Sequence, residues 1–121
     1  MPASSYIGGT IAGQIVFTWD GANVVIVGNW GCAPSVGHPS PGRFQVQTVQ
    51  SLDNPSPESR AIDVDVQLPA GTLIAYDANH LQSGSPNTDD VQLYDAANNP
   101  ADPPAGTRIA VTIYRTKIPQ G

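Results

Sequence analysis

Alternating apolar and polar residues are the main structural signal in this chain, and the clearest case lies between residues 61 and 68. Every second residue there is aliphatic, and the residues between are Asp or Gln. Because successive strand side chains point to opposite faces, this pattern predicts a strand with one buried and one exposed face. Pro69-Ala70-Gly71-Thr72 then interrupts it, which predicts a turn. Leu73, Ile74 and Tyr76 follow, and we expect them to begin the second strand of a hairpin.

The same reasoning predicts further strands along the chain. Asp20-Gly21-Ala22-Asn23 is a tight-turn sequence, so the segments before and after it are expected to form a hairpin. Its second strand, Val24–Val27, is continuously apolar, which predicts a strand covered on both sides. The predicted strands outside the 61–76 hairpin are Thr10–Trp19, Val24–Val27, Arg43–Gln50, Val91–Tyr94 and Arg108–Thr116. The predicted loops, rich in Gly, Pro, Ser, Asn or Asp, are residues 28–42, 51–60, 80–90 and 95–106.

This arrangement of short strands and turn-rich loops predicts an all-β fold. About seven to eight strands in 121 residues are typical of a two-sheet antiparallel β-sandwich, either jelly-roll or Ig-like. The chain is long enough to bury one hydrophobic core. We therefore expect a flexible N-terminal arm at residues 1–9 and a single β-sandwich domain at residues 10–121.

The chain carries few charges. Charged residues make up 12% of it, against about 25% in an average soluble domain, and the formal net charge is −5. Only five residues are basic and they are scattered, so the chain lacks the basic face that nucleic-acid binding needs. The acidic balance also argues against binding to an anionic membrane surface.

The N-terminal residues, MPASSYIGGT, lack the basic and apolar regions of a secretory signal peptide, and the chain holds no apolar run of about 20 residues. We expect neither a signal peptide nor a membrane anchor. Cys32 is the only cysteine, so an intrachain disulfide is excluded. A buried thiol is the favoured interpretation, and pairing between chains is the alternative.

No catalytic motif is present, so we expect no enzymatic activity. His38 and His80 lie in different predicted loops, and neither has a His or Cys partner at ligand spacing. We interpret both as surface histidines without a role. The serines lack the nucleophile-elbow sequence of a hydrolase.

The most concentrated set of possible metal ligands lies between Asn87 and Asp102 and consists of Asp89, Asp90, Asp95, Asn98, Asn99 and Asp102. Calcium takes six to eight oxygen ligands, which such a segment can provide. However, the spacing is not that of an EF-hand, and Asp and Asn in loops usually bond their own backbone. No cofactor is therefore expected, and calcium is kept as a possibility. Its candidate ligands are Asp95, Asn98, Asn99 and Asp102.

Two kinds of residue suggest a binding surface. Trp30 stands at the start of the Gly-rich loop, where an aromatic ring could stack on a sugar, although Trp residues more often fill a core or an interface. Amide side chains also replace the usual Lys and Glu on the predicted strand faces. Such faces are soluble yet cost little to desolvate against another protein surface. The candidate interaction residues are Trp30, Gln45, Gln47, Gln67 and Gln92.

These observations predict a non-enzymatic structural subunit of a larger assembly. The style of the chain resembles small accessory proteins of bacteriophage particles, such as head decoration, tail or fibre components. We expect a symmetric homo-oligomer, such as a trimer, that docks on a capsid or tail protein in the extracellular virion. The alternative is a lectin-like carbohydrate-binding module that uses Trp30 and the Asp95–Asp102 loop, with or without calcium.

Overall fold

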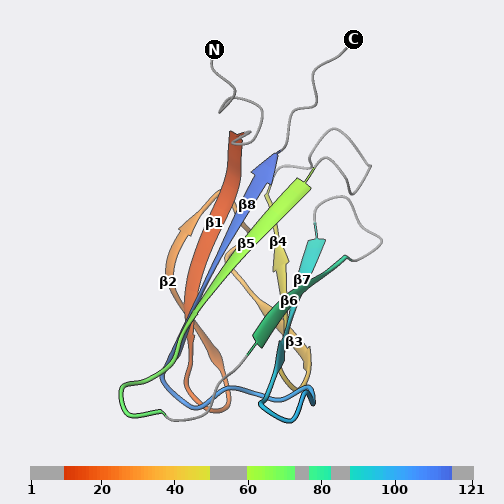
Figure 1. The fold of residues 1–121 in the computed structure, drawn as a ribbon. Coiled ribbons are helices and arrows are strands. Elements are labelled where there is room, and N and C mark those ends of the chain that lie inside the picture. Colours follow the sequence, from red (N-terminus) through yellow and green to blue (C-terminus); the bar gives the residue numbers. More distant parts are fainter. Residues whose placement is uncertain (1–9, 50–59, 73–76, 83–87, 116–121) are drawn as a thin grey trace.

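The computed structural model describes residues 10–49, 60–72, 77–82 and 88–115, which form an all-β protein (Figure 1). Its strands are β1 (Thr10–Trp19), β2 (Val24–Trp30), β3 (Gly37–Ser40), β4 (Arg43–Gln47), β5 (Arg60–Gln67), β6 (Asp77–Gln82), β7 (Thr88–Tyr94) and β8 (Thr107–Arg115). The predicted N-terminal arm, residues 1–9, lies outside the described residues.

The strands form two antiparallel sheets that pack face to face. Sheet 1 has the order β2-β1-β8-β5, and sheet 2 has the order β3-β4-β7-β6. Every strand pair is antiparallel. Among the described residues, the fold is thus the predicted two-sheet sandwich without helices.

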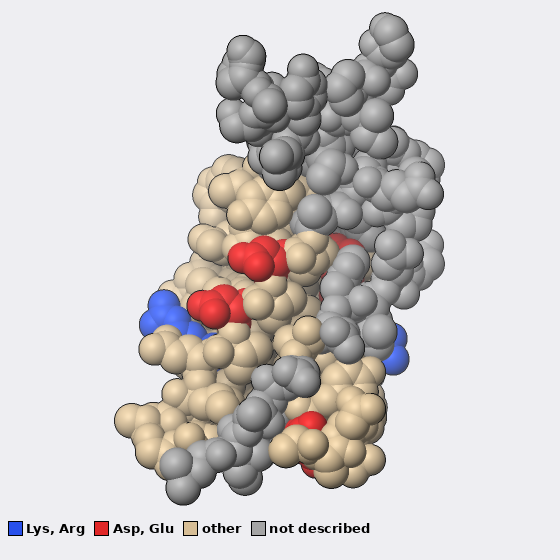
Figure 2. All heavy atoms as spheres, viewed as in Figure 1, with Lys and Arg blue, Asp and Glu red and all other residues tan. Residues whose placement is uncertain are grey.

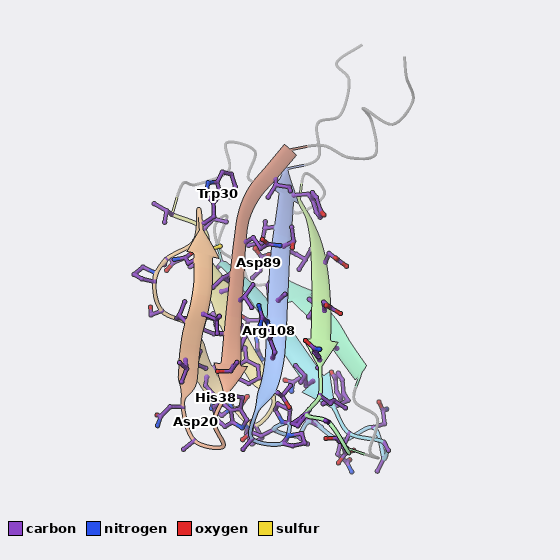
Figure 3. The ribbon with its side chains drawn as sticks, turned by 90° about the vertical axis from the view of Figure 1, so that its left-hand side faces the viewer. Asp20, Trp30, His38, Asp89 and Arg108 are labelled. Carbon is purple, nitrogen blue, oxygen red and sulfur yellow. The ribbon has the colours of Figure 1, made fainter. Side chains whose placement is uncertain are left out.

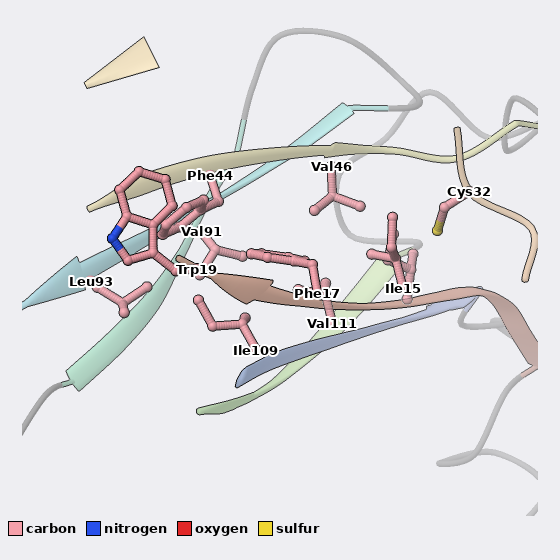
Figure 4. Close-up of a cluster of buried hydrophobic side chains, with 11 residues drawn as sticks. Ile15, Phe17, Trp19, Cys32, Phe44, Val46, Val91, Leu93, Ile109 and Val111 are labelled. Atoms are coloured by element: carbon pink, nitrogen blue, oxygen red, sulfur yellow. The ribbon is translucent and has the colours of Figure 1, made fainter. Parts of the chain in front are cut away.

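Alternation explains why these segments form strands around a single core. Ile15, Phe17 and Trp19 of β1 point inward and are almost fully buried. They meet Phe44 of sheet 2, whose ring lies 5.3 Å from that of Phe17 (Figure 4). Burying each such side chain contributes roughly 1.5–3 kcal/mol. The core residues are Ile15, Phe17, Trp19, Cys32, Phe44, Val46, Val91, Leu93, Ile109, Val111 and Ile113.

The first hairpin is confirmed in its strands and its turn. Asp20 Oδ1 accepts hydrogen bonds from the amides of Ala22 and Asn23, at 2.8 and 2.6 Å. Gly21 takes a φ of 104°, which a residue with a side chain rarely adopts. These backbone hydrogen bonds stabilise the carboxylate and lower the pKa of Asp20. β2 continues three residues beyond the predicted strand, through Trp30.

The second predicted hairpin is wrong. Pro69 and Thr72 do form a turn, with the Thr72 amide 3.1 Å from the Pro69 carbonyl. However, β5 pairs with β8 in sheet 1, whereas β6 pairs with β7 in sheet 2. The segment after β5 therefore leads from one sheet to the other. Leu73, Ile74 and Tyr76 lie outside the described residues.

Three predicted features of the remaining segments need correction. The loop predicted at residues 28–42 contains the last residues of β2 and all of β3. The loop predicted at residues 80–90 contains the end of β6 and the start of β7. Finally, β2 is not covered on both sides, because Val25 and Val27 are 48% and 54% exposed.

Cys32 is buried, as predicted, and helps to join the two sheets. After β2 the chain crosses to sheet 2, where Cys32 forms an isolated bridge with Thr48 at the end of β4. The Ala33 amide donates to the Gln47 carbonyl at 2.7 Å, and the Val49 amide donates to the Gly31 carbonyl at 2.9 Å. This crossing holds the upper end of β2 against sheet 2.

Candidate functional site

The outer side of β2 exposes more large apolar side chains than any other described strand. Val25, Val27 and Trp30, which we call the β2 surface, are 48%, 54% and 62% exposed. β2 is an edge strand of sheet 1, and no strand of the described ranges pairs with its free edge. In Figure 3 it forms the left-hand edge of the sheet, with Trp30 at its upper end. Exposed apolar side chains on an unpaired edge are typical of an interaction surface.

A bulge in β2 determines which of its side chains face outward. The pairing with β1 skips Val27, since Val16 pairs with Gly28 while Phe17 pairs with Ile26. Val24, Ile26 and Asn29 are therefore opposite the inward-facing residues of β1, and Trp30 is opposite Gln14 on the outer face. Of these three, Val24 and Ile26 are partly buried and pack against the core.

The segment that contains β2 is uncharged. Residues 21–37 include no Asp, Glu, Lys or Arg, although the whole chain has a formal net charge of −5. The other edge of the same sheet differs in this respect, because β5 exposes Asp63 and Asp65. Figure 2 shows that much of one face of the molecule is uncharged, with acidic side chains at only a few places.

The predicted glutamine surface is only partly present. Gln45, Gln47 and Gln67 are exposed, but the first two lie on β4 of sheet 2 and the third lies on β5 of sheet 1. Gln92 is only 6% exposed, and its side-chain amide donates to the carbonyls of Pro41 and Leu93 at 3.0 and 3.1 Å. Its assignment to an exposed face was therefore wrong.

A pocket of about 340 Å³ opens beside β2, between the two sheets. Its walls come from the β1–β2 turn, from the inward side of β2 and from the segment that leads into β3. Six of the nine lining side chains are apolar, and the polar ones are Asn23, Ser35 and His38. The lining residues are Trp19, Ala22, Asn23, Val24, Ile26, Pro34, Ser35, Val36 and His38.

His38 is not the surface residue without contacts that the sequence suggested. Its ring packs against two core aromatics, with its centroid 4.6 Å from that of Trp19 and 5.1 Å from that of Phe44. Its Nε2 lies 2.7 Å from Asp102 Oδ1, which also accepts a 2.6 Å hydrogen bond from the Gly42 amide. His38 therefore forms a polar wall of the pocket, oriented by a carboxylate. His80 lies on β6, and its side chain is outside the described part of the chain.

The four candidate calcium ligands mainly organise their own loop. Asp95 Oδ1 accepts hydrogen bonds from the amides of Ala97 and Asn99, at 2.9 and 3.0 Å. Asn98 adopts a φ of 65°, as Asn often does in turns. Asp102 instead binds His38. The described residues contain no group of three or more His, Cys, Asp or Glu side chains that could hold a metal ion, and the calcium site stays a prediction.

The structure does not bring Trp30 together with the Asp95–Asp102 loop. Trp30 lies at one end of β2, and Val24, which pairs with Trp19, lies at the other. The two residues are six positions apart along the strand, or roughly 20 Å. Because Trp19 contacts His38 and His38 contacts Asp102, the loop lies at the end of the molecule opposite Trp30 (Figure 3).

Asp89 and Asp90, which the sequence placed in a polar loop among the possible metal ligands, are instead buried on β7. Asp89 is fully buried, and Asp90, which is 1% exposed, forms an ion pair with Arg43. Burial and the nearby Asp89 raise the pKa of the Cys32 thiol to about 11. Two adjacent acidic residues interrupt the alternation of apolar and polar residues, so the sequence pattern did not indicate that they lie within a strand.

No protein-family model, no curated protein and no solved structure matches the chain. The described residues include no helix that could span a membrane.

Proposed function

We propose that the protein is a non-enzymatic structural subunit that acts by self-association within a larger assembly. The observation that supports this most directly is the β2 surface, where Val25, Val27 and Trp30 are about half exposed or more on an unpaired edge. Burying these side chains against another protein surface would contribute favourable free energy, at roughly 25 cal/mol per Å² of apolar area.

Two of the other three sheet edges support the same proposal by contrast. β3, the neighbouring edge of sheet 2, is only four residues long and contains Pro39, which has no amide hydrogen to donate to a partner strand. β5 exposes two carboxylates. Natural proteins use such features to prevent edge-to-edge pairing, and β2 lacks them.

A bacteriophage particle is the setting that we propose for the assembly, on the grounds of composition. A chain with 12% charged residues and amides on its exposed strands suits a subunit whose surface is largely covered by neighbours. The partner would be a capsid or tail protein. The jelly-roll or Ig-like type of the sandwich also stays a prediction.

The experiment is light scattering coupled to size-exclusion chromatography, over a range of protein concentrations, with calcium and then with a chelator. We expect a mass above the 12.6 kDa of one chain that is indifferent to the chelator. Val27→Lys should weaken self-association by about tenfold or more, since like charges would meet on a desolvated edge.

Val49→Lys is the matched control, because Val49 is 68% exposed but lies outside β2. It should leave the association constant unchanged. A chain that is monomeric at every concentration would contradict the proposal, and so would an equal effect of the two substitutions.

A second candidate function is binding of a small ring-shaped ligand, such as a sugar, in the pocket beside β2. The supporting observation is that the rings of Trp19 and His38 line this pocket together with the polar Asn23 and Ser35, because aromatic rings stack on sugars while polar side chains bind hydroxyls. This replaces Trp30 in the lectin hypothesis. Calorimetric titration with simple sugars tests it, and His38→Ala should abolish any heat that is measured.

A further inference from the structure

Each side chain of β2 points to one side of the sheet, and this order of sides restricts how another strand could pair with β2. In an antiparallel pair, directly opposite residues point to the same side of the sheet. Before the bulge, Val24 and Ile26 point inward and Val25 points outward; after it, Asn29 points inward while Gly28 and Trp30 point outward. Val27, which has no partner on β1, is 54% exposed, and we place it on the outer side with Gly28. A partner strand must have the same inward and outward order, read in the opposite direction.

A second copy of β2 has this order. When Ile26 lies opposite the partner's Asn29, both residues point inward. The same register places Val25 opposite the partner's Trp30 and Val27 opposite the partner's Gly28, all pointing outward. The bulge shifts the alternation of β2 by one residue. In the other registers of β2 against itself that pair four or more residues, an inward-facing residue would therefore lie opposite an outward-facing one. Only this register keeps every opposite pair on the same side of the sheet.

We infer that two copies of the chain join through their β2 edges, antiparallel and related by a two-fold axis between Val27 and Gly28, into one eight-stranded sheet. This inference rests on the proposed function and names the partner surface. Sheet 1 of each copy supplies four of the eight strands.

The side chains at this interface are complementary. Gly28 has no atom within 4 Å of the position that a Cβ would occupy, so the partner's Val27 has room beside it. Val25 against the partner's Trp30 is a pair of a β-branched and an aromatic residue, which stabilises antiparallel strands. The two-fold axis uses each of these contacts twice.

Charge favours the closed dimer over an open chain of subunits. No charged residue lies within residues 21–37, so two β2 edges meet without repulsion. Pairing of β2 with the partner's β5 would instead bring Val25 and Val27 beside Asp63 and Asp65, whose desolvation is costly. That contact is also head-to-tail and would continue into a filament. The β2–β2 contact pairs the uncharged edge strand β2 of each copy and leaves both β5 strands, with their carboxylates, exposed to water.

The test is disulfide cross-linking with the double variant Val25→Cys and Trp30→Cys, oxidised with diamide. Within one chain the two positions are five residues apart along a strand, or roughly 16 Å, which is too far for a disulfide. Across the inferred axis they are directly opposite. Native Cys32 is 3% exposed and its high pKa keeps it protonated, so it should not compete.

We expect the double variant to shift from monomer to disulfide-linked dimer on a non-reducing gel, while each single variant stays monomeric. Cross-linking of the single variants to the same extent would overturn the inferred register. Because the substitutions remove apolar surface, amide hydrogen exchange of the unmodified protein gives an independent measurement. The amides of residues 25–30 should exchange more slowly as protein concentration rises.

The failure of this inference is distinguishable from the failure of the proposed function. If the protein oligomerises in solution while the double variant does not cross-link and the β2 amides exchange at the same rate at all concentrations, another surface is used. The inference is then wrong and the proposed function stands. If the protein is monomeric throughout, both are wrong.

Discussion

The two edges of sheet 1 share an inner face but differ on the outer one. β5 alternates the partly buried Ile62, Val64 and Val66 with exposed Asp and Gln. β2 places Val24 and Ile26 inward in the same way, yet exposes Val25 and Val27. The inner residues of both strands stabilise the same core. Packing in the core therefore explains only the inward-facing residues of each edge strand. The outward-facing residues determine whether the edge stays exposed to water or pairs with another strand.

This difference indicates how self-association can be limited to one side of the molecule. Carboxylates on β5 deter a second strand because burying them is costly, and they also repel copies of themselves. Neither effect operates on β2. A protein with two open edges would polymerise without limit, whereas one with a single open edge can form a closed pair.

The largest expected effect comes from making β5 resemble β2. The double substitution Asp63→Val and Asp65→Val removes both carboxylates from this edge, so that neither edge strand of sheet 1 carries an acidic side chain. We expect species larger than a dimer that grow with protein concentration, measured by sedimentation velocity. The matched control is Asp63→Asn with Asp65→Asn, which removes the charges but retains polar side chains. Unchanged sedimentation of the valine variant would contradict the role assigned to the carboxylates.

A smaller effect is expected where β2 is anchored to the rest of the fold. A Cβ on Gly13 would lie 2.8 Å from the Cys32 sulfur and 3.1 Å from the Gly31 carbonyl oxygen. Gly13→Ala should therefore force the crossing after β2 to shift, at a cost of roughly 1–3 kcal/mol in unfolding free energy. Urea unfolding at low protein concentration measures it.

Gly28→Ala is the control on β2 itself, since a Cβ there would meet nothing within 4 Å. Its unfolding free energy should stay near that of the unmodified monomer. Equal losses in the two variants would show that the crossing at Cys32 does not depend on the small size of Gly13.

The smallest effect concerns the turn that leads into β2. Since hydrogen bonds lower the pKa of Asp20 below 3.8 in the folded state, its carboxylate stabilises the fold at pH values above the pKa of the unfolded chain. That stabilisation is lost as the pH falls through the lowered pKa. Asp20→Ala should therefore be less stable than the unmodified protein at pH 6, and the gap should close near pH 2. Urea unfolding at both pH values tests this, and a gap independent of pH would contradict it.

Alternation was sufficient to predict the strands that span the core. β1 was predicted with its observed bounds, and β8 to within one residue at each end, because their side chains alternate between the core and the outer face. This relation is local, so it can be read from a few neighbouring residues. It also correctly predicted a two-sheet all-β fold and the turn at Asp20 and Gly21.

Only the tertiary structure decided which strands pair and which side chains are covered. The sequence pattern around Pro69 predicted a hairpin, but β5 pairs with β8, more than 40 residues away in the chain. Val25 and Gln92 both lie on outer sheet faces, yet the first is exposed and the second is buried. The contact of His38 with Asp102 joins residues 64 positions apart. Pairing and coverage depend on distant segments that meet only after folding, whereas alternation depends on adjacent residues. The sequence alone therefore determined β1, β8 and their core-facing residues, and the fold determined β3, the strand pairing and the open edge at β2.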